Sequence, residues 1–94
     1  MRWMETIRAR FTEADRRGIL EDLADQLSRL APPAGLEEAR LYVDARVATD
    51  LGIHLGWNTP RVKPEGSILG RRLAAGLRSA GTVNHAVWRE EVCR

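Results

Sequence analysis

Two neighbouring stretches in the middle of the chain, in which apolar residues alternate with polar residues or glycine, constrain the fold most. Every second residue is apolar in the stretch 40–47, and the same alternation, with glycine and histidine between the apolar positions, runs through 51–57. A period of two is typical of strands in a sheet with one buried face. Because Thr49 and Asp50 mark a turn between the two stretches, we predict that they form a hairpin.

A stretch of helical periodicity lies on each side of this hairpin. From Thr12 to Leu30 the leucines recur at helical spacing, and Thr12 is suited to be the N-cap of that helix. After the loop 58–66, Ser67 is suited to cap a second helix whose leucines recur every four residues. Gly81 stands where a C′ glycine ends such a helix. We therefore predict one helix before the hairpin and one after it.

The two ends of the chain are predicted to be strands. Residues 82–89 are rich in residues that favour strands, whereas the N-terminal segment 3–11 fits either one helical face or a strand. The capping signal at Thr12 favours a helix that starts there, and a strand before it completes the order β-α-β-β-α-β. We therefore predict an α+β, ferredoxin-like fold, with an antiparallel four-stranded sheet and two helices on one face.

Length and composition fit one small domain. The chain has 94 residues, of which 44% are hydrophobic and 30% charged, so we assign residues 1–94 to a single soluble ferredoxin-like domain. No run is long and apolar enough for a membrane span, and no secretory signal is recognised. The single cysteine, Cys93, excludes an intrachain disulfide. We expect a cytoplasmic protein, and because acids are interspersed with the bases, we do not expect nucleic acid as a partner.

In its length and in the order of its elements, the chain resembles the dimeric α+β barrel proteins, which include antibiotic biosynthesis monooxygenase-like domains. The resemblance implies a homodimer in which two sheets pair face to face. It also implies that some members oxidise aromatic quinols without a cofactor, while others bind haem. The second helix here carries neither the aromatic residue nor the histidine expected of the monooxygenases. The segments 66–70 and 83–88 also resemble small uncharacterised bacterial proteins, a resemblance that implies no activity.

The strand alternation predicts a mixed surface on the face of the sheet away from the helices. The candidate ligand-binding residues on that face are Tyr42, Arg46, His54, Arg8, Asn84 and Trp88. The pattern of the last strand is mixed: we place Val83 and Val87 inward and Asn84 and Trp88 outward, and the alternative places Val83, His85 and Val87 outward. A turn at 49–50 would put residue i opposite roughly 99 minus i, so that His54 would face a residue near 45, close to Arg46 and Asp44. Gly52 and Gly56 leave room beside His54. We expect a small anion or a polar aromatic compound there; the alternative is a surface network of Asp44, Arg46 and His54 without a ligand.

We predict that the protein is a homodimer through this sheet face, because a monomer would expose Met4, Tyr42 and Trp88. Its biochemical role, and whether it is an enzyme, stay open. One alternative is a cofactor-free or haem-using enzyme with His54 or His85 as general base, and another is a nucleic-acid-binding domain. We predict no cofactor, and no metal site, since the two histidines and Cys93 lack the spacing of zinc ligands.

Overall fold

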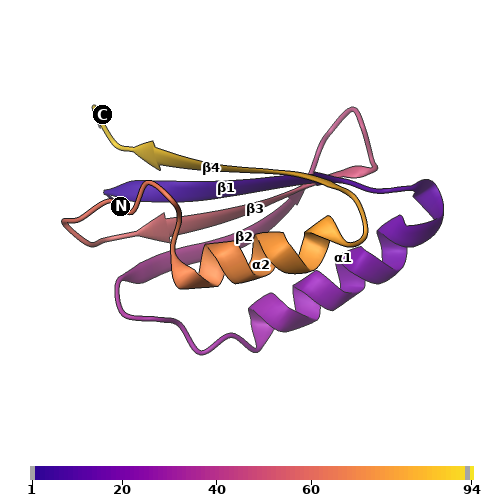
Figure 1. The fold of residues 1–94 in the computed structure, drawn as a ribbon, viewed down its shortest axis with the longest axis horizontal. Helices are drawn as coiled ribbons and strands as arrows, with labels where there is room; N and C mark the ends of the chain where they lie inside the picture. Colours follow the sequence, from indigo (N-terminus) through magenta and orange to yellow (C-terminus); the bar gives the residue numbers. More distant parts are fainter. Residues whose placement is uncertain (1, 93) are drawn as a thin grey trace.

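The computed structural model describes residues 2–92 and 94, and within them six elements follow one another in the predicted order. They are β1 (Trp3–Arg10), α1 (Glu13–Ser28), β2 (Leu36–Val43), β3 (Asp50–Trp57), α2 (Ile68–Arg78) and β4 (Thr82–Arg89). The strands form one antiparallel sheet in the order β2-β3-β1-β4. Both helices lie on the same face of this sheet (Figure 1). The predicted ferredoxin-like fold is therefore confirmed, while Cys93, expected to be without a disulfide partner, lies outside the described residues.

The N-terminal segment is a strand and lies in the interior of the sheet. β1 pairs along its whole length with both β3 and β4. Trp3, Ile7 and Ala9 are buried on the helix side, whereas Arg8 and Arg10 are exposed. This alternation, in which apolar side chains face the helices, is the physical reason why the segment is a strand.

Both predicted helix N-caps are present. Thr12 Oγ1 accepts a hydrogen bond from the Asp15 N–H at 3.2 Å, and Ser67 Oγ accepts one from the Gly70 N–H at 2.9 Å. The prediction for Gly81 is wrong, because α2 ends at Arg78 and Gly81 has no positive φ. Its lack of a side chain allows close packing instead, since a Cβ there would lie 2.2 Å from the Arg10 carbonyl oxygen.

The hydrophobic core lies between the sheet and the two helices. β3 contributes four buried apolar side chains, which are Leu51, Ile53, Leu55 and Trp57. The Trp57 ring stacks on Trp3, with centroids 5.4 Å apart and an angle of 16° between the planes. α2 buries three of its apolar residues, but α1 buries only Leu23. Among the described residues, neither helix is long and apolar enough to cross a membrane.

The first strand of the hairpin differs from the prediction in extent and in register. β2 ends at Val43, so Ala45, Arg46 and Val47 lie in an exposed loop and not in the strand. The Asp44 side chain causes this turn, because its Oδ1 accepts hydrogen bonds from the N–H groups of Arg46 and Val47 at 2.8 and 2.9 Å. The turn shifts the register, and His54 lies opposite Arg40 rather than near residue 45.

Candidate functional site

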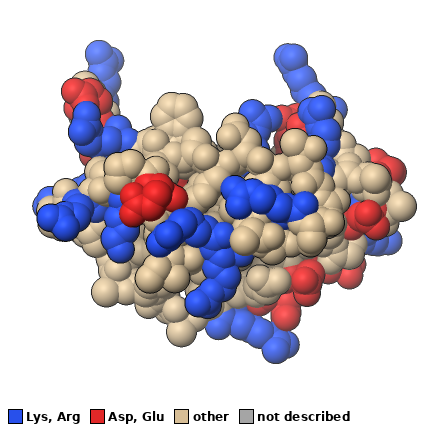
Figure 2. All heavy atoms as spheres, viewed as in Figure 1, with Lys and Arg blue, Asp and Glu red and all other residues tan. Residues whose placement is uncertain are grey.

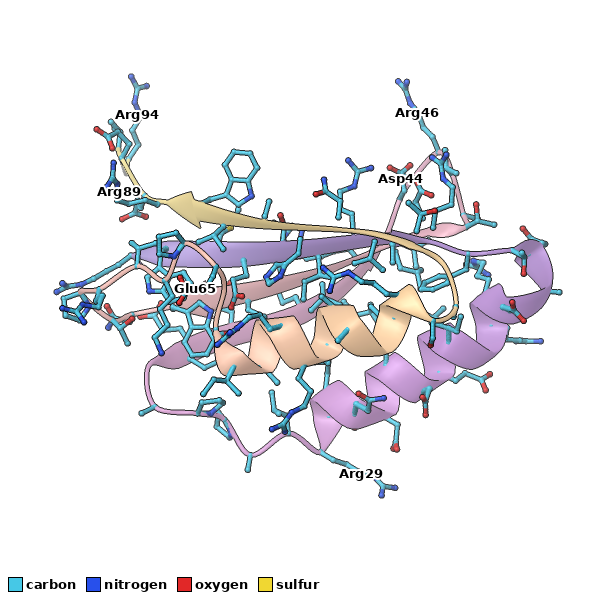
Figure 3. All side chains as sticks on the ribbon, viewed as in Figure 1. Arg29, Asp44, Arg46, Glu65, Arg89 and Arg94 are labelled. Atoms are coloured by element: carbon cyan, nitrogen blue, oxygen red, sulfur yellow. The ribbon has the colours of Figure 1, made fainter. Side chains whose placement is uncertain are left out.

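The face of the sheet away from the helices, here called the open face, is built from rows of side chains that cross all four strands. The strand register defines three rows: Tyr42, Gly52, Arg8 and Asn84; Arg40, His54, Thr6 and Ala86; Glu38, Gly56, Met4 and Trp88. Five of the six candidate ligand-binding residues belong to these rows. Figure 3 shows that no helix covers this side of the sheet.

Tyr42 and His54 form the only close aromatic contact on the described open face. Their ring centroids are 4.6 Å apart, and the planes are tilted by 53°. The two rings line a shallow hollow of about 270 Å³, together with Arg8, Gly52 and the acidic residues Asp44 and Asp50. Because Gly52 brings no side chain into the space between Tyr42 and Arg8, the hollow stays open. The arrangement offers a flat apolar wall, an imidazole and a guanidinium to one small molecule.

The positive charge beside this hollow is largely compensated. Arg10 binds Asp50 through two hydrogen bonds, of 2.5 and 2.9 Å. The Arg8 guanidinium lies 3.9 Å from carboxylate oxygens of both Asp44 and Asp50. The hydrogen bond from Arg10 holds the pKa of Asp50 below its ordinary value, and the N–H groups of Arg46 and Val47 do the same for the pKa of Asp44. Arg8 lines the hollow, and its guanidinium charge is shared between the carboxylates of Asp44 and Asp50.

The other three candidates lie apart from Tyr42 and His54. Arg46, predicted beside them, lies in the loop after Asp44, and Figure 3 shows its side chain projecting away from the sheet. Trp88 lies in the third row and donates a hydrogen bond from Nε1 to Thr6 Oγ1 at 3.0 Å. Asn84 lines a second shallow hollow with Arg8 and Arg10. The alternative, a network of Asp44, Arg46 and His54, is therefore wrong, because the turn at Asp44 removes Arg46 from the strand.

A buried polar group on the opposite side of the sheet was not predicted from the sequence. Glu5 of β1 has an exposed fraction of 0%. Its Oε2 accepts hydrogen bonds from Trp57 Nε1 at 2.8 Å and from the Ser67 hydroxyl at 2.5 Å. Its Oε1 accepts one from the Ser67 N–H at 2.9 Å and lies 2.9 Å from His85 Nε2. We call these four residues the Glu5 cluster; it joins β1, β3 and β4 to the start of α2.

The Glu5 cluster is built to hold the fold together. The chain approaches Glu5 closely at two glycines: a Cβ at Gly70 would lie 2.1 Å from Glu5 Oε1, and Gly66 adopts a φ of +94°. Ser67 is as deeply buried as the core side chains, and both its N–H and its hydroxyl already donate to Glu5. Because both carboxylate oxygens accept hydrogen bonds and the Glu5 side chain is fully buried, a substrate has no route to it.

Comparison of the chain with protein-family models, with curated proteins and with solved structures found no match. Within residues 2–92 and 94, no group of three or more histidine, cysteine, aspartate or glutamate side chains is placed to hold a metal ion. The functional assignment therefore depends on the geometry of the surfaces described above.

Proposed function

We propose that the protein acts as a homodimer in which two open faces pack against each other and bind a small polar aromatic or anionic compound beside Tyr42 and His54. The observation that supports this proposal is the exposure of large side chains on a sheet face that has no helix over it. Trp88 is 56% exposed and Tyr42 is 45% exposed. Met4 lies opposite Trp88 in the third row, and Ala86 lies opposite Thr6 in the second row. A sheet face in permanent contact with water is normally polar.

The size and shape of the open face fit a second copy of the chain. Four strands of eight residues cover ~500 Å² in projection, and two such faces reach the lower limit of ~1,000 Å² for a specific interface. Two projections rise at opposite ends of the face, the loop that carries Arg46 and the segment with Arg89 and Arg94, and they leave a saddle between them (Figures 2 and 3). Both projections carry acidic and basic side chains, so two copies can pair with opposite charges in contact.

The dimer is tested with Trp88→Glu. We expect light scattering at micromolar concentration to give twice the chain mass of 10.6 kDa for the wild type and a single chain mass for the variant. A carboxylate in place of the largest exposed apolar side chain of the interface should weaken association by about 100-fold or more. Ile68→Glu is the matched control, because Ile68 is 65% exposed but lies on α2, away from the open face. A wild-type mass of 10.6 kDa would overturn the dimer.

The compound beside Tyr42 and His54 is tested with benzoate, a small aromatic anion. We expect the amide resonances of Gly52 and His54 to shift on titration, and His54→Ala to weaken binding by about tenfold through the loss of one hydrogen bond and of the ring contact with Tyr42. Asn84→Ala is the control, since Asn84 lies on the same face but is separated from Tyr42 by two strands. Equal affinity of His54→Ala and wild type would contradict this placement.

A further inference from the structure

A second cavity, on the helix side of the sheet, is independent of the open face. It has a volume of about 490 Å³ and lies between the connection from α1 to β2, the connection from β3 to α2, and the first turns of α2. Figure 1 shows that both connections lie at the same end of the sheet. Cavities of 300–1,000 Å³ are typical of small-molecule sites, whereas the hollow at Tyr42 and His54 is smaller and more open.

The inner surface of this cavity is apolar. It is lined by Leu30 and Pro33 of the α1–β2 connection, by Leu69 of α2 and by the stacked pair of Trp3 and Trp57. The two tryptophans have exposed fractions of only 2% and 5%, so they do not offer open ring faces for stacking. A flexible alkyl chain fits such walls better than a rigid aromatic ring does, because it can follow their shape.

The polar residues of the cavity are mainly cationic. Its lining includes Arg61, Lys63 and Arg72 but no acidic residue. Within residues 2–92 and 94, none of these three cations has a carboxylate within 4.0 Å, whereas several other arginines do. The nearby Glu5 carboxylate is fully buried, is bonded within its own cluster and forms no ion pair with these three cations.

One hydroxyl adds a neutral donor to these cations. Trp3 Nε1 donates to Thr59 Oγ1 at 2.8 Å, which leaves the Thr59 hydroxyl proton free to point into the cavity. An apolar interior with uncompensated positive charge and a hydroxyl donor is complementary to an amphipathic anion.

We propose that this cavity binds a monocarboxylate with an alkyl chain, with the chain between Leu30 and Leu69 and the carboxylate at Arg61, Lys63 and Arg72. Three probes of equal chain length test the role of charge: decanoate, decanol and decyltrimethylammonium, all below their micellar concentrations. In ¹⁵N-labelled protein we expect decanoate to shift the indole N–H resonances of Trp3 and Trp57 in a saturable way. The resonance of Trp88, which lies on the open face, should stay in place. Decanol should bind at least about fivefold more weakly, and the cation more weakly still.

A pair of double variants tests the cations directly. Arg61→Gln with Arg72→Gln removes one charge from the β3–α2 connection and one from α2. It should raise the Kd of decanoate by about tenfold while leaving that of decanol unchanged. Arg71→Gln with Arg78→Gln removes the same charge from α2 residues outside the cavity lining, and should leave both values unchanged.

Three results would overturn this proposal: no saturable shift at Trp3 and Trp57, equal binding of decanoate and decanol, or equal losses in the two double variants. A decanoate shift confined to Trp88 would also contradict it, by placing the compound on the open face. Because these measurements do not depend on the oligomeric state, failure of the homodimer proposal would not affect them.

Discussion

Replacing Glu5 with alanine should lower the free energy of unfolding by about 4 kcal/mol. The substitution leaves the buried Trp57 indole N–H and both polar groups of Ser67 without their acceptor. It also removes the partner of His85 and opens a cavity beneath α2. Urea denaturation at pH 7, followed by tryptophan fluorescence and by circular dichroism, measures the change.

Glu5→Gln separates the lost hydrogen bonds from the lost volume, since glutamine has nearly the same shape. We expect it to cost about 2 kcal/mol. The Ser67 N–H and Trp57 Nε1 can only donate, and they bind different oxygens of Glu5. The glutamine NH₂ group must therefore face one of these two donors, whichever way the amide is turned. A cost below about 1 kcal/mol for Glu5→Ala would contradict a structural role for the cluster.

The order and type of the elements could be predicted from the sequence, because they depend on local patterns. The cap at Thr12 placed the start of the first helix, and the completed order β-α-β-β-α-β decided that the segment before it is a strand; the structure confirms both. The orientation of the last strand is also confirmed: Val83 and Val87 pack against the core, while Asn84 and Trp88 face outward.

The register of the hairpin could not be predicted, because one side chain outside the repeating pattern decides it. Apolar residues continue at every second position through Ala45 and Val47, so alternation alone extends the strand beyond Val43. The hydrogen bonds of Asp44 end it there, and His54 comes to lie opposite Arg40. Register follows from turn geometry, which a period of two does not contain.

The Glu5 cluster could be predicted only in part. Glu5 is at the same alternating positions as Trp3, Ile7 and Ala9, so an acid on the buried face of the strand is readable from the sequence. Such an acid needs donors, but those of Glu5 lie 52 to 80 residues away along the chain. Sequence spacing does not indicate which distant strands and helices will supply them.

Two glycines of α2 give the last test of how that cluster is packed. Gly70→Ala should destabilise the protein by about 2 to 3 kcal/mol, although alanine favours a helix over glycine by about 1 kcal/mol. The new methyl group would lie 2.1 Å from Glu5 Oε1 and 2.7 Å from Glu5 Cδ. Glu5 can move away only by breaking its bonds to Trp57 and His85, so the strain is not relieved by a flexible surface side chain.

Gly76→Ala is the matched substitution in the same helix. A Cβ at Gly76 would meet nothing within 4 Å, so only the helical preference of alanine should act. We expect a gain of about 0.5 to 1 kcal/mol. Urea denaturation of both variants should therefore give changes of opposite sign. If Gly70→Ala were as stable as Gly76→Ala, the start of α2 would not be held against Glu5, and the close packing of that carboxylate between β1 and α2 would be wrong.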